Sequence, residues 1–212
     1  MQIIDTSHKD ILTVAKCHRA AFPKSFSSQL GTAYVAKMLS WYLDTEKAFM
    51  FHLEENGKVI GYCGAIINDG TLLTGAASGM TQFSMGVAIK ALLLRPWLFF
   101  HTELMKRYQF LWRNLKMKFG LYHPELETQK KKDSLQSIGL VVIGVDPKFH
   151  GKGYGSKILQ TFEKYGIRNN IPNLYLTVKA DNFKAIKSYQ RNGWQRASLN
   201  GNSLSMKKNI SL

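Results

Sequence analysis

Cysteine is scarce in this chain, which limits the kinds of site that it can build. Only Cys17 and Cys63 occur among the 212 residues. Two thiols cannot form a disulfide framework, and they supply only half of a four-cysteine zinc site. We therefore expect no metal centre, and we expect the protein to work in a reducing compartment.

Long apolar runs are missing as well. No stretch of about 18 uninterrupted apolar residues occurs, so an ordinary membrane-spanning helix is not expected. The opening residues MQIIDTSHKD lack the apolar segment of a signal peptide. With 45% hydrophobic and 20% charged residues, the chain can still bury a core. We expect one cytoplasmic domain over residues 1–212, and peripheral association with a membrane stays open.

Acidic residues are outnumbered two to one. The 29 Lys and Arg against 14 Asp and Glu give a net charge of +15. Residues 1–89 are balanced, whereas residues 90–132 carry +7 and residues 133–212 carry +8. Such a field favours an anionic partner, namely a polyphosphate cofactor, a nucleic acid or an anionic membrane surface. A solvated basic surface that only aids solubility is the alternative.

Apolar periodicity and turn residues predict a mixed α/β sandwich. The strand at 137–145 is nearly all apolar, as expected of a central strand that is buried on both faces. The predicted helices cover residues 6–20, 29–43, 154–167 and 182–192, and the predicted strands cover residues 47–54, 58–67, 137–145, 173–180 and 195–208.

A basic, aromatic-rich insertion over residues 70–132 interrupts this pattern. Residues 75–86 are small and polar, which predicts a loop. Residues 87–118 predict helix with a break at Pro96, because proline suits a first helical turn. Three interpretations stay open: a lid on the core, a homodimer surface, or a segment that contacts an anionic membrane or a phosphorylated substrate. No recognised nucleic-acid module surrounds the aromatics, so no nucleic-acid partner is expected.

The segment IGVDPKFHGKGYGSKI at 143–158 carries the clearest motif. A buried strand leads into a turn with glycines at 151, 153 and 155, and a helix follows. Free N–H groups and the helix dipole attract an anion there, and glycine lets a phosphate approach closely. The spacing fits neither a P-loop nor a dinucleotide fingerprint. A plain strand-to-helix turn is the alternative interpretation.

A second motif follows in TVKADNFKAIKSYQRNGW at 177–194. Asp181 or Asn182 can cap a helix, and Tyr189 lies two helical turns after Asn182 on the same face. Gly193 is suited to end that helix. The alternative is that Tyr189 is simply a core residue.

Together the two motifs resemble the GNAT superfamily of acyl-CoA-dependent N-acyltransferases. The family signature [RQ]-x-x-G-x-[GA], which follows a V-x-P strand end, is met by VDP at 145–147 and by Gly153 and Gly155, with His150 in place of Arg or Gln. The family pattern N-x-x-A-x-x-x-Y-x-x-x-G-[FW] is complete from Asn182 to Trp194. The resemblance covers residues 137–208 closely and residues 1–68 loosely.

The resemblance implies a mixed, mostly antiparallel sheet flanked by helices, with splayed central parallel strands and the helical insertion between the third and fourth strands. It implies acetyl-CoA as co-substrate, with the pantetheine arm along 140–145, the pyrophosphate on the glycine turn, and Tyr189 as the general acid that protonates the departing thiolate. Lys148, Lys152 and Lys157 could pair with phosphates. The implied cofactor-binding residues are Val145, His150, Gly151, Lys152, Gly153, Tyr154, Gly155, Ser156 and Asn182.

The implied reaction is direct attack of a primary amine on acetyl-CoA. The basic charge and the loop AFPKSFSSQLG at 21–31 favour a small anionic acceptor, such as a nucleotide-linked amino sugar. A longer-chain acyl donor, or a non-catalytic CoA-binding or membrane-adaptor domain, are the alternatives. The adaptor stays open because residues 134–145 contain no carboxylate where many family members carry their base. Nearby groups that could act instead are Glu125, Glu127, Asp133, His123 and His150.

Overall fold

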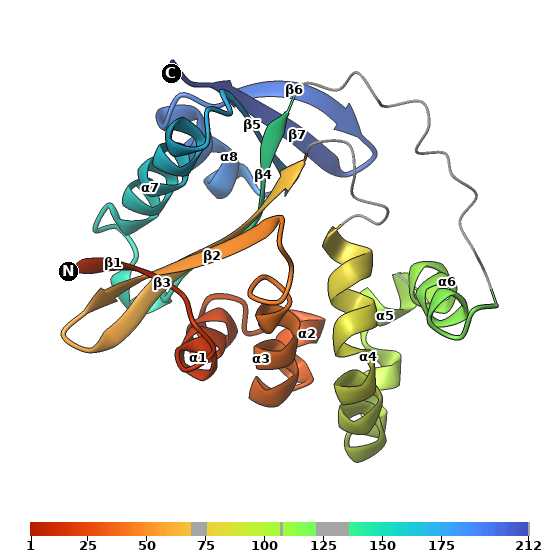
Figure 1. Ribbon diagram of the computed structural model, residues 1–212. Helices are drawn as coiled ribbons and strands as arrows, with labels where there is room; N and C mark the ends of the chain where they lie inside the picture. Colours follow the sequence, from red (N-terminus) through yellow and green to blue (C-terminus); the bar gives the residue numbers. More distant parts are fainter. Residues whose placement is uncertain (69–75, 107, 122–135, 212) are drawn as a thin grey trace.

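The computed structural model describes residues 1–68, 76–106, 108–121 and 136–211 (Figure 1). Its centre is a seven-stranded sheet in the order β1-β2-β3-β4-β5-β7-β6. Neighbouring strands are antiparallel except for β4 and β5, which are parallel. The strands are β1 (Gln2–Asp5), β2 (Ala48–Glu55), β3 (Lys58–Asn68), β4 (Ser137–Val145), β5 (Asn173–Lys179), β6 (Gln195–Asn200) and β7 (Ser203–Asn209).

Helices cover both faces of this sheet (Figure 1). Helices α1 and α3 lie on one face, α7 and α8 lie on the other, and α4 to α6 form the insertion between β3 and β4. The helices are α1 (Ile11–Ala21), α2 (Phe26–Gln29), α3 (Thr32–Ser40), α4 (Ala76–Leu94), α5 (Thr102–Lys106), α6 (Tyr108–Lys118), α7 (Tyr154–Arg168) and α8 (Phe183–Arg191), with 3-10 turns η1 (Pro96–Phe100) and η3 (Pro147–Phe149). The expected fold class and the place of the helical insertion are confirmed.

The alternation of side chains along the strands divides the core into two halves. On β3, Tyr62 packs with α1 and α3, whereas the next residue, Cys63, packs with α7 and α8. Tyr62 lies opposite Gly144 of β4, and Cys63 lies opposite Ile143. The end of β4 at Ile143 and Gly144 therefore lies beside Tyr62 from one half of the core and Cys63 from the other.

The two parallel strands separate partway along their length. Pairing of β4 with β5 runs from Ser137 opposite Asn173 to Leu140 opposite Leu176. Beyond Leu140, β4 continues to Val145 and pairs with β3 on its other side. No pairing with β5 is present for residues 141–145 in the described sheet, which leaves this edge of β4 open to a ligand. The expected splay of the central strands is confirmed.

The prediction of a loop at 75–86 is wrong, because α4 begins at Ala76 and runs through this segment. Small residues here serve close helix packing. A Cβ atom on Gly79 would come within 2.9 Å of the Trp41 ring. Hydroxyl groups are satisfied within the helix, since Thr81 donates to the Ala77 carbonyl and Ser84 to the Met80 carbonyl. The small polar composition thus marks a packed helix face.

Other differences concern boundaries. The single strand expected at 195–208 is the hairpin β6–β7, which turns at Gly201 with φ of 55°. The helix expected at 29–43 is the shorter α3, which begins after Gly31 with its φ of 103°, while Gln29 ends the separate helix α2. Helix α1 begins at Ile11 and not at residue 6, because Asp10 accepts hydrogen bonds from the amide and hydroxyl of Ser7 ahead of the first turn.

Candidate functional site

A cavity of about 590 Å³ opens beside the separated end of β4. Its walls come from the end of α1, from β4, from the glycine turn that leads into α7, and from α8. The lining residues are Ala21, Phe22, Ile143, Gly144, Val145, Phe149, His150, Gly151, Gly153, Tyr154, Gly155, Ser156, Asn182, Lys184, Ala185, Lys187, Ser188 and Arg191. The structure thus brings eight of the predicted cofactor-binding residues together around one cavity; Lys152 and Tyr189 are not among the lining residues.

The glycine turn has a backbone that only glycine adopts readily at two positions. Gly151 and Gly153 both have φ of 79°, in the left-handed region. Gly153 is the N-cap residue of α7, and no described side chain caps this helix. A Cβ atom on Gly155 would meet no described atom within 4 Å. The first turn of α7, from Gly153 to Ser156, lines the cavity, and free N–H groups at a helix N-terminus suit an anion.

Local hydrogen bonds hold the approach to this turn. The Asp146 carboxylate accepts from the Lys148 amide at 2.9 Å. The Nε2 atom of His150 lies 3.0 Å from the Val145 carbonyl oxygen. The imidazole in place of the family's usual Arg or Gln therefore joins the end of β4 to the turn. His150 is exposed, and its contact with the Val145 carbonyl holds the imidazole in place.

Other predicted residues of the turn are held by specific partners. The Tyr154 hydroxyl donates to Glu55 at 2.9 Å, and this hydrogen bond raises the pKa of the phenol. The Ser156 hydroxyl accepts from the Asn192 amide group at 3.1 Å, which joins α7 to the end of α8. Lys152 instead lies over Phe149, with Nζ 5.6 Å from the ring centroid.

Helix α8 supplies the cavity with cations that the sequence analysis did not select. Lys184, Lys187 and Arg191 all line it. They lie three and four residues apart, so they share one helix face. That spacing was readable within the predicted helix at 182–192. Asn182 begins the helix, and its Oδ1 atom accepts from the Ala185 amide at 3.2 Å. The Asn182 side chain is thus used as a cap at the cavity wall.

Tyr189 lies on the buried side of α8. Its side chain is 9% exposed and packs against Trp194, with ring centroids 6.3 Å apart. Burial raises the pKa of the Tyr189 phenol to about 12, and the nearby Cys63 thiol adds to the shift. The phenol therefore stays protonated at neutral pH.

A buried polar chain lies on the opposite side of β4. The Nδ1 atom of His18 is 2.5 Å from the Tyr62 hydroxyl, and its Nε2 atom is 3.2 Å from the Ser27 hydroxyl. Burial lowers the pKa of His18 to about 4, so the imidazole is neutral. This chain joins α1, β3 and the loop at 21–31. Nothing in the sequence pattern identified it, because its members are distant in sequence.

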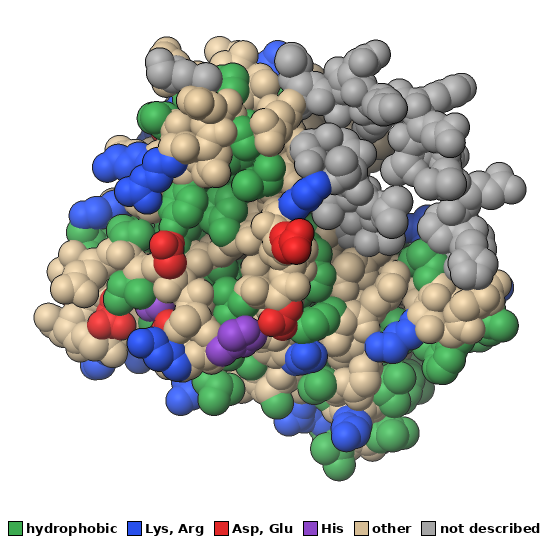
Figure 2. Space-filling view, viewed as in Figure 1, with side chains coloured by type: hydrophobic (Ala, Val, Ile, Leu, Met, Phe, Trp, Pro, Cys, Tyr) green, Lys and Arg blue, Asp and Glu red, His purple; other side chains and the backbone are tan. Residues whose placement is uncertain are grey.

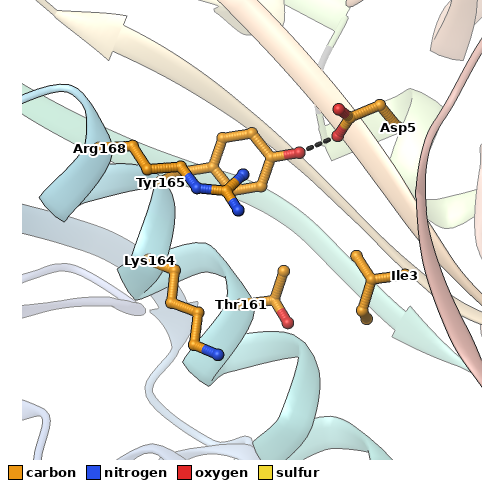
Figure 3. A pocket seen from close by; sticks show the side chains of 6 residues that line it. All are labelled: Ile3, Asp5, Thr161, Lys164, Tyr165 and Arg168. Carbon is orange, nitrogen blue, oxygen red and sulfur yellow. Dashed lines mark hydrogen bonds between the residues drawn. The ribbon is translucent and has the colours of Figure 1, made fainter.

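Two other features lie apart from this cavity or outside the described residues. Figure 3 shows a cavity of about 230 Å³ between β1 and α7, where the Tyr165 hydroxyl donates to Asp5. None of the motif residues lines it. In the described part of the chain, no group of three His, Cys, Asp or Glu side chains is arranged to hold a metal ion. Four residues considered as the base, His123, Glu125, Glu127 and Asp133, lie outside the described residues.

Comparison with known proteins agrees with the fold and the motifs. Residues 119–194 match the acetyltransferase (GNAT) family. The fold is similar to PaiA N-acetyltransferase from Thermoplasma acidophilum in complex with coenzyme A, at 12% identity and a TM-score of 0.56, over 99% of this chain and 100% of that one. It is also similar to the ribosomal-protein-S18-alanine N-acetyltransferase from Escherichia coli, at 15% identity and a TM-score of 0.55, over 100% and 94% of the two chains.

An aminoglycoside 6′-N-acetyltransferase from Acinetobacter haemolyticus has a similar fold at 11% identity and a TM-score of 0.56, over 94% of each chain. The names of the last two enzymes state different acceptors, a ribosomal-protein alanine and an aminoglycoside, so the shared fold leaves the acceptor open. None of the curated protein sequences matches this chain.

Proposed function

We propose that this chain, a GNAT-type acetyltransferase by its fold and by its match over residues 119–194, moves an acetyl group from acetyl-CoA to a primary amine on a small anionic acceptor. Acetyl-CoA is the co-substrate of this family. The observation that carries the proposal is the cavity formed by the open edge of β4, the N-terminus of α7 and the cationic face of α8, with the end of α1 as its fourth wall.

These walls match the chemistry of CoA from one end to the other. In our proposal, the two amides of the pantetheine arm hydrogen-bond the backbone of residues 141–145, which lack a partner on the β5 side. The pyrophosphate lies on the amides from Gly151 to Ser156, where the helix dipole also favours negative charge. Lys184, Lys187 and Arg191 neutralise the phosphates.

The proposed reaction is one displacement at the thioester. The lone pair of the neutral amine attacks the carbonyl carbon, the C–N bond forms, and the C–S bond breaks. Tyr189 donates its phenolic proton to the departing sulfur, and the amine nitrogen loses a proton through water to solvent. The products are the N-acetylated amine and free CoA, and Tyr189 regains its proton from solvent.

A phenol with a pKa of about 12 suits this acid role only if the thiolate beside it is also strongly basic. The same burial supports that condition. Burial raises the pKa of the neighbouring Cys63 thiol well above its ordinary range. Neither Tyr189 nor Cys63 lines the cavity, so the proposal requires the thioester to reach the buried side of α8. We infer that the CoA thiolate released there meets the same penalty and takes the proton from Tyr189.

The charge of the chain supports an anionic acceptor, such as a nucleotide-linked amino sugar. All of the +15 net charge lies in residues 90–212. A protein amine beside basic residues would be repelled by this field, whereas a phosphorylated amine would be attracted. The two cysteines are both free and buried, which supports our placement of the enzyme in the reducing cytoplasm.

A second candidate function is transfer of a longer acyl chain. A cavity of about 200 Å³ lies between α2–α3 and the insertion. Most of its lining is apolar and includes Tyr34, Met38, Met80 and Phe110. An acyl chain that reached this space would be removed from water, which favours binding in proportion to its buried area.

Thermal unfolding with CoA, acetyl-CoA and longer acyl-CoAs tests these proposals. A ligand that binds the folded state raises the melting temperature by mass action. The largest rise with acetyl-CoA would support acetyl transfer, and a rise that grows with chain length would support the second candidate. Thiol release should then be measured with a panel of amines that includes amino-sugar nucleotides. Thermal shifts without thiol release from any amine would indicate a CoA-binding adaptor, and no shift with any CoA would contradict the cavity assignment.

A further inference from the structure

The end of α4 and the turn η1 expose a cluster of large apolar side chains. Four of them are more than half exposed: Leu93 at 72%, Leu94 at 79%, Trp97 at 63% and Phe100 at 83%. We call these four residues the insertion tip. They lie within eight residues of one another, at the end of α4 and in the turn η1 that follows it. Ile89 and Phe99, which are 46% and 49% exposed, extend the cluster.

The insertion tip is held firmly by the residues between its exposed members. Ala91 and Leu98 are buried and pack on Leu30 from the loop after α2. The Arg95 guanidinium donates to the Leu30 carbonyl at 2.7 Å. The Glu103 carboxylate accepts from the Phe26 amide at 3.0 Å. The exposed apolar groups therefore project from an anchored backbone, and their exposure is not the result of a loose segment.

The charged residues of the insertion are almost all basic. Residues 76–121 contain seven Lys and Arg but a single acidic residue, Glu103. That carboxylate is already used by the Phe26 amide. Figure 2 shows the same composition at the bottom of the molecule over the end of α4, where green and blue side chains meet without red ones. Apolar groups within a cationic surround are the composition of a segment that lies in the interface of an anionic bilayer.

The geometry of α4 fits a position in the plane of a bilayer better than a crossing. By length and composition this helix could span a membrane. However, Ser78, Ser84 and Met85 are buried against the rest of the protein. The Gln82 side chain donates to the Asn114 side chain on α6 at 3.2 Å. A crossing helix would have to leave these partners, whereas the insertion tip can enter lipid without any such change.

We propose that the insertion tip docks this protein on an anionic phospholipid surface, with Leu93, Leu94, Trp97 and Phe100 entering the interface. Lys90 of α4 and Lys106 of α5 contact the headgroups. This inference is independent of the acetyl-transfer proposal, since none of the residues involved lines the CoA cavity.

Tryptophan fluorescence of the full chain gives a direct test. Trp41 and Trp194 are buried at 8% and 2% exposure, whereas Trp97 and Trp112 are 63% and 53% exposed. Vesicles of phosphatidylcholine with phosphatidylglycerol should shift the emission to the blue and protect it from acrylamide. Pure phosphatidylcholine vesicles should have a weaker effect. Trp97→Phe should abolish most of the blue shift while the protein still sediments with the vesicles, because phenylalanine keeps the patch apolar.

Co-sedimentation with the same vesicles supplies the decisive variants. Leu94→Glu with Trp97→Glu should lower the partition coefficient by about tenfold or more, since it removes two apolar anchors and adds like charge to the lipid. Lys90→Glu should lower it by about fivefold, and added salt should weaken wild-type binding. Leu199→Glu is the matched control, because Leu199 is 65% exposed on β6. Lys58→Glu in the β2–β3 hairpin controls for net charge.

Each variant is first checked for a cooperative thermal transition, so that loss of folding is not counted as loss of binding. Absence of wild-type sedimentation with anionic vesicles would overturn the proposal, as would equal sedimentation of wild type and the double glutamate variant. The protein could instead fail to bind vesicles but form a concentration-dependent dimer that the double glutamate variant abolishes. That result would assign the insertion tip to a second copy of this chain and would also overturn the proposal.

Discussion

The Nδ1 atom of His18 lies 2.5 Å from the Tyr62 hydroxyl, although the two residues are 44 positions apart in the sequence. The contact joins α1 to the central strand β3 at the level of Gly144, which lines the cavity at the separated end of β4. Both groups are buried, so the contact satisfies the Tyr62 hydroxyl and the Nδ1 atom of His18, while the Nε2 atom of His18 is paired with Ser27. A histidine in such a position couples the stability of the fold to pH.

Stability should fall on acidification because of His18. Its pKa is about 4 in the folded protein and near 6.5 when unfolded, so unfolding takes up a proton between these values. The contribution of the neutral imidazole is complete above pH 6.5 and is lost as the pH falls toward 4. Its full size is about 3 kcal/mol. Urea unfolding at a series of pH values should show this slope.

His18→Gln should flatten part of that slope while lowering stability at neutral pH. Burial also lowers the pKa of His52, so a smaller acid slope should remain in the variant. His8→Gln is the control, because His8 is exposed and pairs at the surface with Asp44 at 3.2 Å. An acid slope that is identical in wild type and His18→Gln would contradict the assignment.

Gly144→Ala should disturb the cavity wall. The added Cβ atom would come within 2.6 Å of the Tyr62 ring and 3.2 Å of the Phe22 ring. We expect a loss of about 1–3 kcal/mol of stability from overpacking, together with weaker CoA binding. Gly139→Ala on the same strand is the matched control, since its Cβ atom would meet Ile66 at an ordinary 3.4 Å. Calorimetric titration with CoA compares the two.

Tyr189→Phe should lower kcat by about a hundredfold or more and leave the Kd for CoA nearly unchanged, because the hydroxyl acts on the departing sulfur. The pKa of about 12 further predicts no loss of activity from phenol ionisation below about pH 11. Tyr175→Phe on β5 serves as the control. A Tyr189→Phe enzyme with wild-type kcat would remove Tyr189 from the acid role.

Lys184→Gln combined with Lys187→Gln should weaken CoA binding by about three- to tenfold, since each cation gives a partly exposed charge-assisted contact. The salt dependence of the CoA affinity should decrease in parallel. Lys164→Gln on α7 is the control, because Lys164 lies on the β1–α7 cavity of Figure 3. Equal affinities of the double variant and the wild type would show that the phosphates lie elsewhere.

The part of the site that could be predicted from the sequence is the part made by short-range geometry. The strand at 137–145, the glycine turn and the capped helix after Asn182 each follow from neighbours in the sequence, and the structure has them all. The cationic face of α8 obeys the same periodicity and could have been found. The roles assigned to these residues stay predictions until the variants are measured.

What could not be predicted depends on packing between distant segments. The small polar residues of segment 75–86 predict a loop from local preference alone. The packing of Trp41 against Gly79, which leaves no room for a larger residue, is not visible in the sequence. Strand β1 is only four residues long, so its pattern is too short to recognise without its partner β2. The contact between His18 and Tyr62 has no local signal at all. In each case tertiary contacts decide the structure against weak local preference.

The place of the insertion has a consequence for how the chain reaches its native state. Strands β3 and β4 are neighbours in the sheet, yet residues 69–136 come between them. Each doubling of such a connection adds only about 0.6 kcal/mol of closure entropy, but the search for the partner strand lengthens. Strands β1–β3 with α1 and α3, and β4–β7 with α7 and α8, each come from one continuous stretch of the chain. We expect these halves to form first during synthesis and to join last, so that the cleft with Phe22 on one side and α8 on the other exists only after the final docking step.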